Sequence, residues 1–193
     1  FALAITARLL PGARTLDDSF ITYRYVRNIL AGNGFVYNPG ERVLGTTTPF
    51  YTILLTSAGV FGGGVEANFP QISLLINALA DGVTCLLFLQ LGRRLGAKYA
   101  GIGAGLVWAI APFSVTFAIG GLETSVYVLL LVATISAYLS SANILAALLA
   151  ALMYLTRPDA LILIGPLALD RFLQIYRHPE NRPSRQKISY EML

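Results

Sequence analysis

The sequence predicts an all-α membrane protein, a polytopic bundle of transmembrane helices with a long first extracytoplasmic loop that bears interfacial helices. Hydrophobic residues make up 55% of the 193 residues and charged residues only 12%, whereas soluble domains carry about a quarter charged residues. Apolar runs near the roughly 20 residues that cross a bilayer recur along the chain. The polar stretch 11–48 is too long for a simple connector, so we expect the chemistry there.

The chain is mildly basic, with 14 Lys and Arg against 10 Asp and Glu, but the excess lies in two short segments. No basic stripe runs along a helix, so the expected partner is the lipid bilayer and not nucleic acid. Cys85 is the only cysteine and lies inside an apolar run, which rules out an intrachain disulfide.

We expect a single transmembrane domain that is the N-terminal part of a longer module. Its parts are the end of a first membrane helix at 1–10, an extracytoplasmic loop at 11–49, membrane helices within 50–173 and a basic cytoplasmic segment at 174–193. The apolar runs expected to cross are 71–91, 100–119, 122–139, 143–155 and 160–173, of which the last two are short.

The apolar run 49–61 decides the topology, because about 13 residues rise only about 20 Å against about 30 Å of hydrocarbon. We predict a short or partly inserted helix that brings residues 46–48 back to the first loop. The loops 11–48, 120–124 and 157–159 then share one side of the membrane. The other side receives eight of the 14 basic residues, which makes it cytoplasmic. If 49–61 crosses completely, the first loop faces away from the other two.

The first loop is expected to hold a helix at the membrane interface. Thr15 is the predicted N-cap, which places Asp17 and Asp18 in the first turn, where the helix dipole favours negative charge. The Gly-Asn-Gly run at 32–34 supplies the left-handed conformations that end a helix. Thr48 followed by a proline then predicts the start of the next helix.

Asp17 and Asp18 are the candidate catalytic residues. A carboxylate at a partly dehydrated interface has a raised pKa, which suits a general base that takes a proton from a hydroxyl acceptor. The alternative is that both acids only stabilise the helix start. A divalent cation is the other use of paired carboxylates, but two acids supply too few ligands to predict a metal site. We favour Asp17 as the base, because Asp18 stands three residues after Thr15 and suits the capping-box position.

The candidate phosphate- and substrate-binding residues lie in three places. Arg24 and Arg27 are one helical turn apart and suit a phosphate, although they also suit lipid headgroups. Glu123 follows Gly121 and Leu122 at the junction of two expected spans, where a first-turn acid is the alternative. The last candidates are Arg157 and Asp159, for which a local ion pair with each other is the alternative.

A polar stripe of Ser73, Asn77 and Asp81 runs through the run 71–91 at spacings of one helical turn. A charge near the middle of a membrane helix costs at least a few kcal/mol, so the stripe must face protein or water. Such stripes join helices, but this one also supports an alternative function, a polytopic transporter or channel with the stripe as its path. We find no inverted repeat to support that alternative.

Three motifs of the first loop resemble the first extracytoplasmic loop of GT-C class glycosyltransferases. They are DDSFITYRY at 17–25, GNGFVYNPGERV at 32–43 and GTTTP at 45–49. They look closest to the bacterial branch that contains the terminal arabinofuranosyltransferases and is similar to the dolichyl-phosphate-mannose mannosyltransferases. The shorter motifs GLET at 121–124 and RPD at 157–159 occur in the order and spacing of that branch, so the resemblance covers nearly the whole chain.

The resemblance implies an enzyme that takes a sugar from a polyprenyl-phosphate carrier outside the cytoplasmic membrane and passes it to a hydroxyl of a glycan, lipid or protein. An acid of the first loop then serves as general base, matching Asp17 or Asp18. Members of this family are much longer, with further helices that commonly shape the choice of acceptor, so this stretch alone need not be active.

Overall fold

The computed structural model describes residues 1–41, 43 and 45–177. These residues form helices and no strand, which confirms the all-α class. The chain divides into two compact units, Phe1–Pro158 and Asp159–Leu193. The expected basic segment at 174–193 lies outside the described residues from 178 onward.

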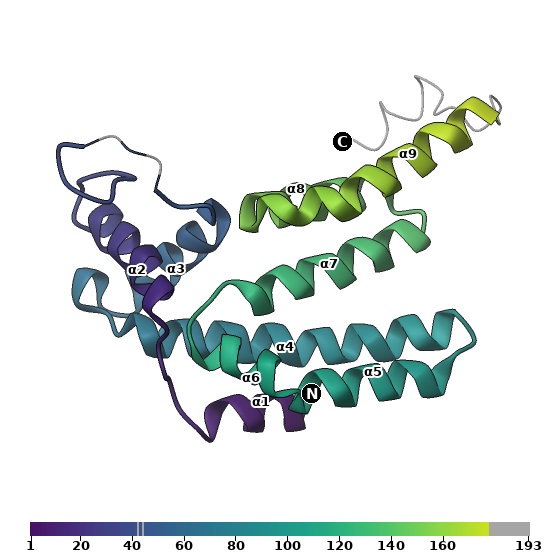
Figure 1. Ribbon diagram of the computed structural model, residues 1–193, viewed down its shortest axis with the longest axis horizontal. Helices are drawn as coiled ribbons and strands as arrows, with labels where there is room; N and C mark the ends of the chain where they lie inside the picture. Colours follow the sequence, from purple (N-terminus) through teal and green to yellow (C-terminus); the bar gives the residue numbers. More distant parts are fainter. Residues whose placement is uncertain (42, 44, 178–193) are drawn as a thin grey trace. The chain divides into compact units, whose positions relative to one another are not determined.

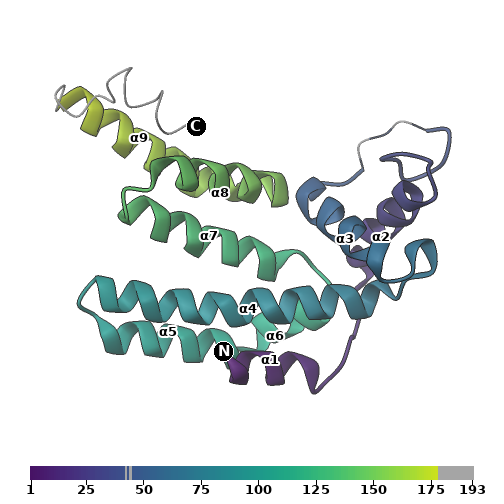
Figure 2. The same cartoon turned by 180° about the vertical axis from the view of Figure 1, so that it is seen from behind.

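The first unit is arranged around one long helix, α4. Its helices are α1 (Ala2–Leu9), α2 (Asp17–Leu30), α3 (Pro49–Phe61), the short 3-10 helix η1 (Gly64–Glu66), α4 (Phe69–Arg94), α5 (Lys98–Ile110), α6 (Pro112–Ile119), α7 (Thr124–Leu139) and α8 (Asn143–Thr156). Helix α4 packs against α1, α5 and α7, and α7 packs in turn against α8 (Figures 1 and 2). The described residues of the second unit include helix α9 (Leu161–Arg177), with Pro166 inside it.

Helix α4 coincides with the predicted span 71–91 and extends it at both ends. Asn68 caps its start by accepting a hydrogen bond from the backbone N–H of Gln71, and the helix ends at Arg93 and Arg94. Among the described residues, α4 is the one unbroken helix that is long and apolar enough to cross a membrane. Helices α3, α7 and α8 are apolar but shorter. A polytopic bundle therefore stays a prediction.

The predicted continuous span 100–119 is wrong, because the chain breaks between α5 and α6. The two helices meet at an angle of 50°. Ala111, between them, has an extended backbone with ψ 127°. Pro112 explains the break, since it donates no backbone hydrogen bond and disfavours helical backbone in the residue before it. Helices α5 and α6 can cross together only as a bent pair.

Helices α2, α3 and η1 gather at the N-terminal end of α4, which starts at Phe69 (Figures 1 and 2). The Tyr23 ring of α2 stacks on Phe69, with 6.1 Å between ring centroids. Helix α3 starts after Thr48 with Pro49 in its first turn, as predicted. The backbone N–H of Gly45 donates to the Tyr25 hydroxyl at 2.7 Å, so the segment just before α3 folds back onto α2. Whether α3 enters a membrane stays a prediction.

Candidate functional site

The first turn of α2 carries both candidate acids and is held against the junction between α6 and α7. The Leu16 N–H donates to the Gly120 carbonyl at 2.9 Å, and the Ser19 hydroxyl donates to the same carbonyl at 2.7 Å. Asp17 and Asp18 follow directly and are exposed. Within the described part of the chain, no three His, Cys, Asp or Glu side chains form a group that could hold a metal ion.

The predicted N-cap at Thr15 is wrong. Helix α2 begins at Asp17 after Leu16, whose backbone is extended, and no side chain caps its start. The pairing of Leu16 with Gly120 sets the point at which the chain enters the helix. Both acids still lie in the first turn, where the helix dipole favours them. The capping-box argument that favours Asp17 over Asp18 is lost.

The α6–α7 junction is fixed from two sides. The side-chain amide of Asn77 on α4 donates to the carbonyls of Ala118 at 3.1 Å and Leu122 at 2.9 Å. The Tyr51 hydroxyl of α3 donates to the Gly121 carbonyl at 3.2 Å. Gly121 has φ +81°, a left-handed backbone that glycine adopts readily, so the chain turns sharply before α7.

Glu123 and Arg157 form an ion pair, with 3.3 Å between Arg157 Nη1 and Glu123 Oε1. The Glu123 side chain is 14% exposed and the Arg157 side chain 39%. The guanidinium also lies over the Tyr127 ring, 5.6 Å from its centroid. This pair joins the end of α8 to the start of α7. Asp159 is exposed and belongs to the 3-10 turn Pro158–Ala160 at the start of the second unit.

The structure therefore brings together three of the predicted site regions. The Leu16–Gly120 bond joins the first loop to the junction, and the Glu123–Arg157 pair joins the junction to the end of α8. The start of α2, with its two exposed acids, therefore contacts the α6–α7 junction. Glu123, which is mostly buried, and Arg157 lie where α7 starts and α8 ends.

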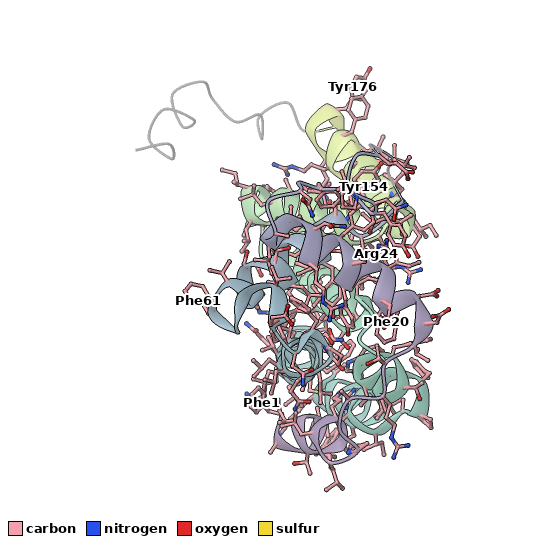
Figure 3. All side chains as sticks on the ribbon, turned by 90° about the vertical axis from the view of Figure 1, so that its left-hand side faces the viewer. Phe1, Phe20, Arg24, Phe61, Tyr154 and Tyr176 are labelled. Carbon is pink, nitrogen blue, oxygen red and sulfur yellow. The ribbon has the colours of Figure 1, made fainter. Side chains whose placement is uncertain are left out.

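Arg24 and Arg27 do not converge on one point. Arg24 holds the first loop: its Nε donates to the Tyr37 carbonyl at 2.9 Å and its Nη2 to Asn38 Oδ1 at 2.6 Å. Its guanidinium lies 4.4 Å from the centroid of the Tyr37 ring. Arg27 lies over the Phe69 ring at 5.3 Å. Both arginines are exposed, and Figure 3 shows Arg24 beside Phe20 on α2.

Tyr23 connects α2 to the polar stripe of α4. Its hydroxyl lies 2.6 Å from that of Ser73. Burial raises the pKa of Tyr23 above its ordinary value, while the hydrogen bonds with Ser73 and Ser19 act in the opposite direction. The phenol is therefore protonated at neutral pH and serves as a neutral hydrogen-bonding group.

A buried ion pair between Arg8 of α1 and Asp81 of α4 was not anticipated from the sequence. Arg8 Nε lies 2.7 Å from Asp81 Oδ2, and both side chains are fully buried. Asp81 also accepts hydrogen bonds from Trp108 Nε1 and the Ser125 hydroxyl, each at 2.9 Å. The available signal was two isolated charges in separate apolar runs, because a charge inside a membrane segment needs a partner.

The polar stripe of α4 joins helices, as one of its two interpretations predicts. Ser73 contacts α2, Asn77 holds the α6–α7 junction, and Asp81 binds groups from α1, α5 and α7. All three side chains are fully buried. A stripe engaged in this way does not line a water-filled path, so the structure gives no support to the transporter alternative.

Two curated proteins match the chain, and both are named terminal β-(1→2)-arabinofuranosyltransferase. The protein from Mycobacterium tuberculosis is 38% identical over 114 residues, which is 56% of this chain. The protein from Corynebacterium glutamicum is 35% identical over 109 residues, which is 55% of this chain. The predicted resemblance is confirmed. These names support a glycosyltransferase.

The matched stretch spans 18% of the mycobacterial relative and 16% of the corynebacterial one, so the chain corresponds to a minor part of each. No family model matches the chain. No solved structure matches it either.

Proposed function

We propose that the chain is part of a membrane glycosyltransferase that moves a sugar from a polyprenyl-phosphate carrier to a hydroxyl acceptor at the extracytoplasmic side of the membrane. The names of the two relatives make arabinofuranose the first donor sugar to test. The observation that carries the proposal is the bond between Leu16 and Gly120, which places two exposed acids beside the junction that bears the Glu123–Arg157 pair.

The proposed reaction is a single displacement. Asp17 or Asp18 takes the proton of the acceptor hydroxyl as its oxygen forms a bond to the anomeric carbon. The bond between that carbon and the phosphate oxygen breaks, and its electron pair leaves with the polyprenyl phosphate. One base is enough for this reaction, since no covalent enzyme intermediate forms.

The leaving phosphate gains negative charge, which nearby guanidinium groups stabilise. Arg157 is the first candidate, because its ion pair with Glu123 fixes it at the α6–α7 junction, which the residue before α2 also contacts. Arg27 is the second, about two and a half turns beyond Asp18 along α2. Arg24 contributes indirectly, since its guanidinium is engaged with the Tyr37 carbonyl and the Asn38 side chain. Asp159 keeps its predicted role in substrate binding.

The test is replacement of each acid in the full-length enzyme, supplied with polyprenyl-phosphate arabinofuranose and an arabinofuranosyl acceptor. Asp17→Asn and Asp18→Asn keep the size of the side chain and remove the base. Loss of a positioned general base costs about 10²–10⁴ in rate, so at least one variant should lose most turnover while still inserting into the membrane.

The matched control is Glu66→Gln, which removes an exposed acid from η1 and should leave the rate unchanged. Near-normal transfer by both Asp variants would exclude these acids as the base.

A further inference from the structure

A pocket of about 320 Å³ opens where the first loop folds back on α2. Its described walls include two residues of α2 and four of the loop: Ile21, Tyr25, Tyr37, Asn38, Glu41 and Val43. The volume is at the lower end of the range of small-molecule sites. Neither the proposed base nor the proposed phosphate contacts use this pocket.

Hydrogen bonds to α2 hold the walls in place. The Tyr25 hydroxyl donates to the Val43 carbonyl at 3.1 Å and accepts from the Gly45 N–H at 2.7 Å. The Asn28 side chain donates to the Tyr37 carbonyl at 2.8 Å, and Arg24 binds that carbonyl as well. A ligand therefore meets a wall that is already ordered, which lowers the entropy that binding costs.

The lining combines aromatic rings with hydrogen-bonding groups. The rings of Tyr25 and Tyr37 lie 5.8 Å apart, and the side-chain amide of Asn38 donates to Glu41 Oε2 at 3.0 Å. The half-buried Tyr37 ring, packed against the fully buried Tyr25 ring, offers aromatic surface to the C–H faces of a sugar ring, and a carboxylate with an amide suits its hydroxyls. The Glu41 carboxylate disfavours a phosphate, because like charges repel.

The pocket lies farther along α2 than the two acids, toward the C-terminal end of the helix. Ile21 follows Asp17 by four residues and Asp18 by three, and these spacings place side chains on the same side of a helix. At about 1.5 Å of rise per residue, Tyr25 lies roughly 10 Å beyond Asp18 along the axis. A sugar ring bound between these points can present a hydroxyl to the first turn of α2.

We propose that this pocket binds the sugar ring of the hydroxyl acceptor, with Glu41 and Asn38 as hydrogen-bonding partners of its hydroxyls. The inference rests on the proposed function, for which it names the acceptor subsite.

The test compares the KM for acceptor with the KM for donor in the full-length enzyme. Glu41→Gln removes a charged hydrogen-bond acceptor, and Val43→Trp fills the pocket from its rim. Glu41→Gln should raise the KM for an arabinofuranosyl acceptor about tenfold or more, the effect of losing one hydrogen bond to a charged group. Val43→Trp should also raise it, because the indole ring occupies the space of the sugar. The KM for polyprenyl-phosphate arabinofuranose should stay unchanged. A higher donor KM, or an unchanged acceptor KM, would overturn the assignment.

Matched controls are Glu66→Gln and Val60→Trp, both at exposed positions outside the pocket. A second readout does not need turnover: saturation-transfer NMR of methyl arabinofuranoside with the full-length protein in detergent. Signal should be retained in Val60→Trp and lost in Val43→Trp, and equal signal in the two would contradict the pocket. If the sugar binds in this way while Asp17→Asn and Asp18→Asn retain full activity, the proposed base fails and the acceptor subsite stands.

Discussion

Arg8 shows how a single charged side chain is accommodated in the helical core. Its five N–H donors face Asp81, the Ser114 hydroxyl and the backbone carbonyls of Ala4, Trp108 and Ala109. The last two carbonyls belong to the end of α5, where Pro112 interrupts the helix. Arg8 therefore supplies donors to backbone groups that the break leaves without helical partners.

We predict that the Arg8–Asp81 pair stabilises the fold only while both members are present. Removing one partner of a buried ion pair costs about 3–5 kcal/mol, because the other charge stays buried and unpaired, whereas replacing both by apolar residues is often neutral. Asp81→Leu and Arg8→Met should each lower the thermal unfolding temperature of the purified protein, and the double variant should lose clearly less than the sum of the two single losses. Additive losses would contradict this coupling.

At the scale of elements, the contact between α4 and α5 depends on glycine at particular positions. A Cβ at Gly101 would lie 2.6 Å from the Phe88 carbonyl oxygen and 2.9 Å from Gly92 Cα, both on α4. A Cβ at Gly103 on the same helix would meet nothing within 4 Å. The backbones of the two helices can approach closely only on the Gly101 side, as small residues allow in membrane helices.

Gly101→Ala should therefore destabilise the protein by about 1–3 kcal/mol, since the added methyl group overpacks a tight contact. Gly103→Ala is the matched control and should be neutral or slightly stabilising, because alanine favours the helix over glycine by about 1 kcal/mol. Thermal unfolding of the two variants measures the difference. Equal effects would show that α4 and α5 do not rely on this close approach.

At the scale of the whole molecule, local patterns in the sequence predicted the elements better than the contacts between them. The all-α class, the short helix Pro49–Phe61 and the first turn at Asp17 follow from composition, length and charge near a helix start. The Arg8–Asp81 pair spans 73 residues, and no local pattern encodes such a contact. The predicted start of α2 at Thr15 was wrong for the same reason. The hydrogen bond between Leu16 and Gly120, and not a local side-chain cap, sets where this helix begins.

The break at Pro112 was readable in the sequence, but averaging over a continuous apolar run hides a single proline. For the candidate site, the sequence indicated the residue types and their grouping. It did not predict that Arg157 pairs with Glu123, or that Arg24 is engaged in holding the first loop.

The membrane topology gives the last prediction. Helix α2 contacts both α3 and η1, so the chain before and after α3 lies near α2 at one end of α4. In a Cys85→Ser background, single cysteines at Asn33 and Glu66 should therefore both react with a membrane-impermeant reagent added from outside the cell. A cysteine at Ala97, in the turn between α4 and α5, should react only after permeabilisation, because α4 is long enough to cross. All three positions are exposed. Labelling at Asn33 with protection at Glu66 would mean that α3 crosses completely, which would separate the first loop from the α6–α7 junction and contradict the proposed site.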